Sequence, residues 1–325
     1  MITLSIEHVS SPLAREFSIS RGAKTSAESV LVTLQQDGFT GRGESVPYGR
    51  YGETVESVIA AIEEHRATIK SGLKRTELQS LMPPGAARCA VDCAMWDLEA
   101  KRAGKPVWQL AGLPEPAPLE TAVTIVLSSA DEMAKAASEA PGKLLKVKLG
   151  GDGDMDRVRA VHEARPDARL ILDANEQLEA GAFPGLAREA ARLGVVLIEQ
   201  PFAAGKDGAL LKRPPEVAIC ADESAHTREQ VQDLARLYDA VNVKLDKTGG
   251  LTEAIAMVRE AKACGLGVMV GCMVAGSISM APAVLLGTLA DAVDLDGPLW
   301  LSKDVEHGLQ YEGGTVFPPS QDLWG

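Results

Sequence analysis

Hydrophobic and polar residues follow two different periods in the first third of the chain. Residues 1–46 contain short alternating runs, such as Ser29–Leu34, which are typical of antiparallel strands. The segments Glu53–Lys70 and Ala86–Ala103 instead place apolar side chains at helical spacing. Strands followed by helices predict an α+β domain over residues 1–115.

The pattern changes after three prolines at residues 114–118, which predict a linker. Over residues 116–299, short β-branched runs alternate with helical stretches. The candidate strands are Glu120–Leu127, Leu144–Leu149, Arg169–Asp173, Val195–Glu199, Val217–Ala221, Ala240–Lys244, Gly267–Val270 and Ala292–Leu295. The candidate helices include Asp131–Glu139, Asp156–Ala164, Phe183–Leu193, Thr227–Leu237 and Thr252–Cys264.

Eight strands spaced roughly 25 residues apart favour an α/β fold of the TIM-barrel type. The alternative is an open Rossmann-like sheet, which would place a glycine-rich phosphate loop after its first strand. The run Gly150–Gly153 follows the second strand and is flanked by acids, which suits a turn better.

Composition narrows the functional classes. The chain has 325 residues, 46% of them hydrophobic and 24% charged, which is typical of a folded globular protein. Its net charge of −12 argues against nucleic-acid binding. Five cysteines without metal-ligand spacing suggest reduced thiols and a cytoplasmic protein. We see no signal peptide and no apolar run long enough for a membrane helix.

Acidic residues end or follow three consecutive candidate strands. Asp173, Glu199 and Asp222 lie one strand-helix unit apart, so in a barrel their side chains would converge at the C-terminal ends of the strands. Crowded carboxylates repel unless a cation compensates them, and an all-oxygen set suits Mg²⁺. For each acid alone, capping of the next helix is the alternative.

Lysines flank these acids in the strand order. Lys146 and Lys148 share one face of the strand before Asp173, and Lys244 ends a later strand. Lys148 and Lys244 would then face each other across the barrel mouth. We expect neighbouring positive charges to lower the pKa of a lysine there and make a neutral amine available as a base. The alternative is a solvated pair on an exposed strand face.

This arrangement implies a reaction class. A carboxylate bound to Mg²⁺ can stabilise the enediolate that forms when its α-proton leaves. One lysine would remove the proton from one face and the opposite lysine would return a proton to the other face, which inverts the α-carbon. With only one base, the same site could catalyse elimination or cycloisomerisation.

Several motifs resemble the enolase superfamily, in its muconate-lactonising subgroup, over nearly the whole chain. The helix around Arg88–Leu98, the Lys-x-Lys, Asp-Ala-Asn and Glu-Gln-Pro segments, and Ala-Asp-Glu-Ser carry the likeness. The stretches Val243–Ala254, Gly271–Met273 and Asp294–Pro298 look more narrowly like bacterial dipeptide epimerases that act on L-Ala-D/L-Glu. The resemblance implies a modified (β/α)7β barrel with an N-terminal α+β capping domain, which residues 300–325 would complete.

The resemblance also implies roles for individual residues. Asp173, Glu199 and Asp222 would bind Mg²⁺, and Lys148 and Lys244 would be the acid/base pair. The implied substrate contacts are Thr124, Lys146, Cys272, Asp294, Asp296 and Lys24.

Two of these contacts have specific tasks. Asp294 and Asp296 would share a strand face and hold the dipeptide's ammonium group. Lys24 occupies the position of an arginine that binds the glutamate side chain in the family. A lysine lacks the guanidinium fork, so selectivity for a carboxylate would be looser.

Some assignments stay open at this point. Cys272 could be packing, and Arg50 and Tyr51 could shape the site or form a surface turn. Related reactions include o-succinylbenzoate synthesis, N-acylamino-acid racemisation and muconate cycloisomerisation, whose substrates have no free ammonium for Asp294 and Asp296. A non-catalytic scaffold and an NAD-dependent enzyme are the remaining alternatives. The expected partner is a small dipeptide, with no nucleic acid or membrane, and a homo-oligomer is possible.

Overall fold

The N-terminal alternation forms a sheet, as the sequence predicts. The computed structural model describes residues 2–212 and 216–325. Val30, Val32 and Leu34 are fully buried on one face of the central strand, which gives the sheet one packed side. The antiparallel strands, in spatial order, are β1 (Thr3–Ile19), β2 (Gly22–Gln36) and β3 (Phe39–Ser45).

Five helices follow this sheet. The predicted helix Ala86–Ala103 is confirmed, whereas the single helix predicted over Glu53–Lys70 is wrong. It starts late because Thr54 forms a capping box, and it breaks at His65, whose dihedral angles (φ −101°, ψ 5°) are not helical. The helices are α1 (Val55–Glu64), α2 (Arg66–Lys70), α3 (Arg75–Leu81), α4 (Ala86–Ala103) and α5 (Val107–Ala111).

Two glycines bring α4 into direct contact with β3. A Cβ atom at Gly43 would lie 2.2 Å from Ala90 O, and one at Gly41 would lie 2.3 Å from Ala94 O. Any larger side chain would push the helix away from the strand. Glycine at both positions therefore fixes the distance between sheet and helix in the capping region.

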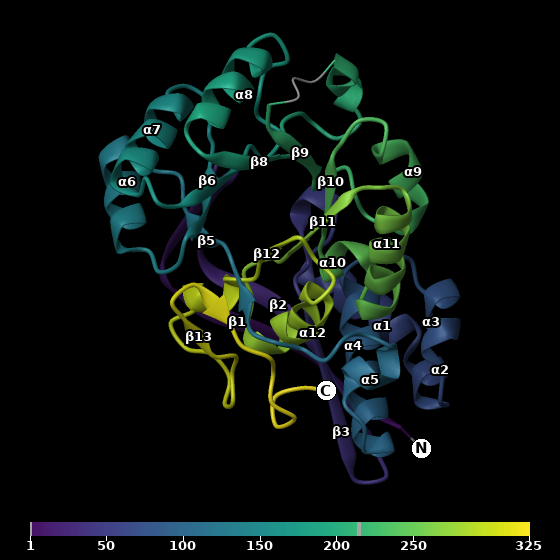
Figure 1. Cartoon of the computed structure of the whole chain (residues 1–325). Helices are drawn as coiled ribbons and strands as arrows, with labels where there is room; N and C mark the ends of the chain where they lie inside the picture. Colours follow the sequence, from purple (N-terminus) through teal and green to yellow (C-terminus); the bar gives the residue numbers. More distant parts are fainter. Residues whose placement is uncertain (1, 213–215) are drawn as a thin grey trace.

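The eight predicted parallel strands form a ring (Figure 1). The strands β5 and β12 stand at the two ends of the strand order, and Ala122 N–H donates to Val293 O at 2.8 Å between them. The barrel prediction is confirmed and the open-sheet alternative is wrong. In order, the strands are β5 (Val123–Ile125), β6 (Leu144–Lys148), β7 (Arg169–Asp173), β8 (Val195–Glu199), β9 (Ala218–Ala221), β10 (Ala240–Val243), β11 (Gly267–Gly271) and β12 (Ala292–Asp294).

Helices cover the outside of the ring (Figure 1). The helix predicted over Thr227–Leu237 is much shorter: only Val231–Leu234 is α-helical, and Arg228–Gln230 before it is a 3₁₀ helix. The α-helices are α6 (Ala130–Glu139), α7 (Asp154–Ala164), α8 (Phe183–Arg192), α9 (Val231–Leu234), α10 (Leu245–Thr248), α11 (Leu251–Ala263) and α12 (Ser277–Gly287). The 3₁₀ helices are Gly49–Tyr51, Asp207–Lys212, Arg228–Gln230 and Gly297–Trp300.

The strand predicted over Glu120–Leu127 is divided between two sheets. Its first residue belongs to β4 (Leu119–Glu120), which pairs with β14 (Thr315–Val316) and so leaves the barrel wall. The strand β13 (Tyr311–Glu312) completes this small antiparallel sheet.

The C-terminal segment returns to the capping region. Trp324 Nε1 donates to Arg42 O at 2.8 Å, and the Gly325 amide donates to Asp97 Oδ1 at 2.7 Å. The exact domain boundaries stay a prediction. Among the described residues, no helix combines the length and apolarity that a membrane crossing requires.

Candidate active site

Three buried carboxylates lie at the C-terminal ends of adjacent barrel strands. Asp173 is the last residue of β7, Glu199 is the last residue of β8, and Asp222 follows β9. The strand register places Asp173 opposite Glu199, and all three residues are at most 2% exposed. The structure therefore brings together the residues that the sequence predicts as cation ligands.

The two lysines of β6 contact these carboxylates. Lys146 Nζ lies 2.7 Å from Glu199 Oε2 and 3.1 Å from Asp173 Oδ2. Lys148 Nζ donates to Asp173 Oδ2 at 2.5 Å. Both lysines are buried, so a solvated pair on an exposed strand face is wrong.

Lys148 and Lys244 lie on opposite sides of the barrel. Lys244 follows β10 and donates to Asp222 Oδ2 at 2.8 Å. In the ring of eight strands, three strands separate β6 from β10 in either direction. Both lysines line the same cavity. A ligand in this cavity would therefore have one lysine on each side.

Nearby carboxylates raise the pKa of Lys146 and Lys244, although burial alone would lower it. Burial lowers the pKa of Lys244, but attraction to Asp222 and Glu199 outweighs burial and holds it well above the usual value. The pKa of Lys146 is raised by the same balance of burial and carboxylate charge. Burial and the charge of Asp173 raise the pKa of Glu199 to about 7. These directions apply to the carboxylates without a cation, so the lowering of a lysine pKa expected from like charges and a bound cation stays a prediction.

The donor set at this end of the barrel fits a hard divalent cation. Six buried carboxyl groups stand beside four buried lysines and Arg21, which pairs with Glu223, so the ionised groups carry one more negative than positive charge. Glu199 Oε2 is buried, and its partner is the ammonium group of Lys146, whose Nζ lies 2.7 Å away. The carboxyl groups belong to Asp173, Glu199, Asp222, Glu223, Asp294 and Asp296, and the lysines are Lys146, Lys148, Lys244 and Lys247.

Lysine ammonium groups contact four of these carboxylates, those of Asp173, Glu199, Asp222 and Asp294. Within residues 2–212 and 216–325, no three histidine, cysteine or acidic side chains already form a metal-binding group. Oxygen-only donors with surplus negative charge are nevertheless what Mg²⁺ binds in proteins, and a bound cation would oppose the pull of the carboxylates on the lysines. The ligand roles of Asp173, Glu199 and Asp222 stay a prediction.

The cavity beside the lysines has a volume of about 370 Å³ and lies between the capping region and the barrel. Its barrel wall includes the predicted contact Cys272 and the acid Asp222. Loops and strands of the capping region supply the opposite wall. These capping residues include Phe17, Ile19, Arg21, Lys24, Tyr48, Arg50 and Tyr51.

Lys24 is one of the exposed cations of this wall. Its Nζ lies 5.5 Å from the centre of the Tyr48 ring, and within the described residues it forms no ion pair. Arg50 instead forms two hydrogen bonds to Glu176, at 2.8 and 2.7 Å. The ring of Tyr51 packs 4.6 Å from His226. Arg50 and Tyr51 thus both line the cavity and contact the barrel.

Four predicted substrate contacts lie in the barrel interior and do not line the cavity wall. Asp294 ends β12 and accepts a hydrogen bond from Lys146 Nζ at 2.7 Å. Asp296 accepts the Thr124 amide at 2.7 Å, and burial together with the charge of Asp294 raises its pKa to about 6. The expected shared strand face is wrong, because β12 ends at Asp294 and Asp296 begins a 3₁₀ turn.

Several residues of the site escaped the sequence-based predictions. Arg21 donates to Glu223 Oε1 at 2.9 Å and to Tyr48 Oη at 3.0 Å, which ties the capping region to the barrel. Asn242 and Lys247 contact the predicted cation ligands directly. Asn242 could have been found from its spacing, because it lies two residues before Lys244 and so shares its strand face.

The fold and the site define a capped barrel with buried acids and opposed lysines at the strand ends. Comparison with family models assigns this class. The mandelate racemase/muconate lactonizing enzyme N-terminal domain matches residues 1–112, and an enolase C-terminal-like domain matches residues 128–322. The chain belongs to the mandelate racemase/muconate lactonizing enzyme family of the enolase superfamily.

Curated relatives are similar over nearly their whole length. The L-Ala-D/L-Glu epimerase of Escherichia coli K12 is 44% identical, covering 97% of this chain and 99% of that protein. The N-acetyl-D-glutamate racemase of a Pseudoalteromonas species is 39% identical, covering 91% and 95%.

Solved structures share the same fold. An enolase family member from Agrobacterium tumefaciens, with bound sodium and L-Ala-L-Glu, is 49% identical at a TM-score of 0.97, covering 100% of both chains. A dipeptide epimerase from Enterococcus faecalis, in complex with Mg and L-Leu-L-Tyr, is 26% identical at a TM-score of 0.91, covering 97% of this chain and 96% of that one.

Proposed function

We propose that this chain is a Mg²⁺-dependent dipeptide epimerase that interconverts L-Ala-L-Glu and L-Ala-D-Glu. The observation that carries the proposal is the placement of Lys148 and Lys244 on opposite strands of one cavity, beside three buried carboxylates. Relatives named for this activity, and solved relatives with bound dipeptides, support it.

The two lysines divide the proton transfer between them. Asp173, Glu199 and Asp222 would hold the cation, which when bound stabilises negative charge on the substrate carboxylate. The neutral amine of one lysine takes the α-proton from its side of the cavity. The ammonium group of the other lysine donates a proton to the opposite side, and the α-carbon is inverted.

The remaining predicted contacts would select the substrate. Asp294 and Asp296 would hold the dipeptide's ammonium group, and Lys24 would attract the glutamate side chain. Thr124 and Lys146 would keep Asp296 and Asp294 in place through the hydrogen bonds already described. Cys272 would line the wall of the pocket. A role in cell-wall peptide recycling in the cytoplasm is part of the proposal.

Racemisation of an N-acylated amino acid is the second candidate, because the Pseudoalteromonas relative is named for it. The two acids of the β12 end favour the dipeptide. An N-acetyl substrate has no free ammonium for these carboxylates, so its binding would leave Asp294 Oδ1, which is buried without a hydrogen-bond partner, unpaired.

Isotope exchange tests the proposal. We expect purified protein with Mg²⁺ in deuterated water to convert L-Ala-L-Glu into a mixture of both diastereomers, with deuterium at the glutamate α-carbon in nuclear magnetic resonance spectra. N-acetyl-glutamate under the same conditions should react far more slowly. Absence of deuterium from the dipeptide, or faster exchange with N-acetyl-glutamate, would contradict the proposal.

A further inference from the structure

The three predicted cation ligands share a pattern in how their oxygens are bonded. One oxygen of each carboxylate accepts a hydrogen bond from a fixed neighbour: Asn175 N–H at 3.1 Å for Asp173, Asn242 Nδ2 at 2.7 Å for Glu199, and Lys247 Nζ at 2.6 Å for Asp222. The second oxygen of each lies near Lys146, Lys148 or Lys244. Each carboxylate thus has one restrained oxygen and one oxygen that a cation could take.

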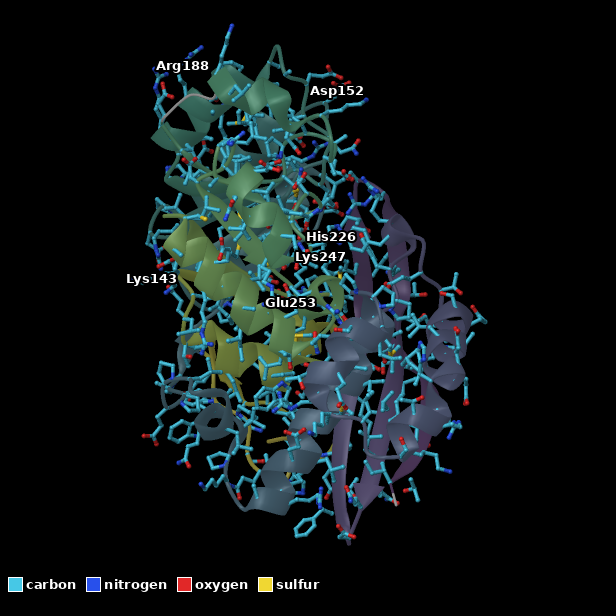
Figure 2. The ribbon with its side chains drawn as sticks, turned by 90° about the vertical axis from the view of Figure 1, so that its right-hand side faces the viewer. Lys143, Asp152, Arg188, His226, Lys247 and Glu253 are labelled. Carbon is cyan, nitrogen blue, oxygen red and sulfur yellow. The ribbon has the colours of Figure 1, made fainter. Side chains whose placement is uncertain are left out.

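Lys247 differs from Lys244 although both contact Asp222. Lys247 Nζ has three partners, which are Asp222 Oδ1 at 2.6 Å, Asp222 O at 2.6 Å and Asn242 O at 3.0 Å. An ammonium group has three hydrogens, so this side chain is saturated. It is 2% exposed and does not line the cavity, and it lies where the barrel meets the capping region (Figure 2). Lys244 lines the cavity and contacts the other oxygen of Asp222.

Asn242 holds the neighbouring ligand from the same chain segment. It lies on β10, is fully buried, and donates to Glu199 Oε1. The backbone carbonyl oxygen of Asn242 is one of the three partners of Lys247. The segment from β10 to α10 therefore restrains two ligands that belong to two other strands.

We propose that Asn242 and Lys247 are positioning residues that hold Glu199 and Asp222 in the orientation needed to bind a divalent cation. The inference rests on the proposed function, because it assumes that these carboxylates bind the cation. It assigns opposite tasks to two lysines three residues apart, since Lys247 orients Asp222 and Lys244 faces the reacting groups.

Charge and orientation predict opposite results for a neutral replacement of Lys247. Removal of a positive charge beside Asp222 would by itself strengthen cation binding. Loss of three hydrogen bonds that orient Asp222 would weaken cation binding, and loss of such outer partners costs about 10–100-fold in metal affinity. Lys247→Met therefore separates a positioning role from simple charge compensation.

The experiment measures Mg²⁺ affinity directly, by titration calorimetry of the metal-free full-length protein without substrate. We expect Lys247→Met and Asn242→Ala each to bind Mg²⁺ about 10–100-fold more weakly than the native protein. Lys244→Met is the matched control, because it removes the same charge from the same carboxylate on the cavity side. This control should bind Mg²⁺ at least as tightly as the native protein.

Other outcomes overturn the inference. Native-like or tighter Mg²⁺ binding by Asn242→Ala, or by a folded Lys247→Met, would refute it. Unfolding midpoints in a chelating buffer show whether each variant is folded, and if Lys247→Met does not fold, Asn242→Ala decides alone. If the native protein itself binds no Mg²⁺, the proposed function fails and the inference fails with it, whereas native binding with unaffected variants refutes the inference alone.

Discussion

The two ends of the barrel interior are built from the same strands but have opposite character. Toward the N-terminal ends, the inward side chains form an apolar layer beside a hollow of about 480 Å³. Two residues further along the strands, the inward positions carry charge. The pairs are Leu144 and Lys146, Ile171 and Asp173, Leu197 and Glu199, and Cys220 and Asp222.

This difference shows that residues only two positions apart on a strand can serve different purposes, one stabilising the fold and the other forming the active site. Residues i and i+2 share a face, so a strand can contribute one apolar and one charged side chain to successive layers. The apolar layer covers one side of the charged layer, and burial together with the charge of Asp173 raises the pKa of Glu199. Substitutions in the two layers should therefore have separable effects.

The largest effect should come from the charged layer. Replacing Lys148 or Lys244 with alanine should slow epimerisation by about 10²–10⁴-fold or more, because each removes one acid/base group. Each variant should still exchange the α-proton of one dipeptide diastereomer, and the two variants should favour opposite diastereomers. Deuterium incorporation measured separately for each diastereomer checks this.

Lys143 is exposed and directly precedes β6, so it provides the matched control. The Lys143→Ala variant should retain native rates. A Lys148→Ala or Lys244→Ala variant that exchanges both diastereomers equally would contradict the opposed arrangement.

A truncation in the apolar layer should affect stability instead. Ile171 is fully buried two residues before Asp173. Ile171→Ala should lower the free energy of unfolding by about 2–5 kcal/mol, since it removes buried methyl groups and enlarges a void. Denaturant unfolding gives this value, and the turnover number of the folded variant should stay close to native. A large loss of turnover with little loss of stability would show that the layers are not independent.

Asp296 should matter for the dipeptide more than for the cation. Asp296→Asn removes the charge predicted to hold the ammonium group, and charge-assisted hydrogen bonds contribute about 1.5–3 kcal/mol, so KM should rise roughly 10-fold or more. Burial and Asp294 raise the pKa of Asp296 to about 6, so its negative charge is lost as the pH falls through that value.

The native KM should accordingly rise on acidification below about pH 6, and the variant should lack that component. Steady-state kinetics across this pH range, with calorimetric Mg²⁺ titration alongside, make the comparison. Equal losses of dipeptide and Mg²⁺ affinity would count against the role assigned to Asp296.

The smallest effect should come from the contact between cap and barrel. Glu176 accepts hydrogen bonds from Arg50, and Arg21 also contacts it. Because these ion pairs are only partly buried, we expect Glu176→Gln to raise KM by a few-fold, on the order of 1 kcal/mol, with little change in turnover. The exposed Glu179 nearby offers Glu179→Gln as control. A control effect as large as that of Glu176→Gln would show that general surface charge, and not the contact, sets KM.

The barrel could be predicted from sequence because its strands are short, buried and regularly spaced. The carboxylates could be predicted because Asp173, Glu199 and Asp222 end or follow such strands, and the topology alone brings strand ends together. The departure of β4 from the barrel could not be predicted, because its partner β14 lies almost 200 residues away in the chain.

The contacts between charged groups also could not be predicted from the local sequence pattern. The raised pKa of Lys244 depends on Asp222 and Glu199, and sequence spacing does not give the balance between their attraction and burial. The sequence wrongly placed Asp296 on the same strand face as Asp294, because β12 ends at Asp294 and a 3₁₀ helix follows. Where a short strand ends depends on tertiary packing more than on local propensity.

The closure of the barrel between β5 and β12 has a consequence for hydrogen exchange. Besides the backbone bond from Ala122 to Val293, side chains join this seam: the Leu295 amide donates to Thr121 Oγ1 at 2.8 Å, and the Thr124 amide donates to Asp296 Oδ2 at 2.7 Å. Protection of the Thr124 amide from solvent deuterium thus depends on the orientation of a carboxylate that is also predicted to bind the dipeptide. A single amide proton would report both how tightly the wall is sealed and whether a ligand has drawn that carboxylate away.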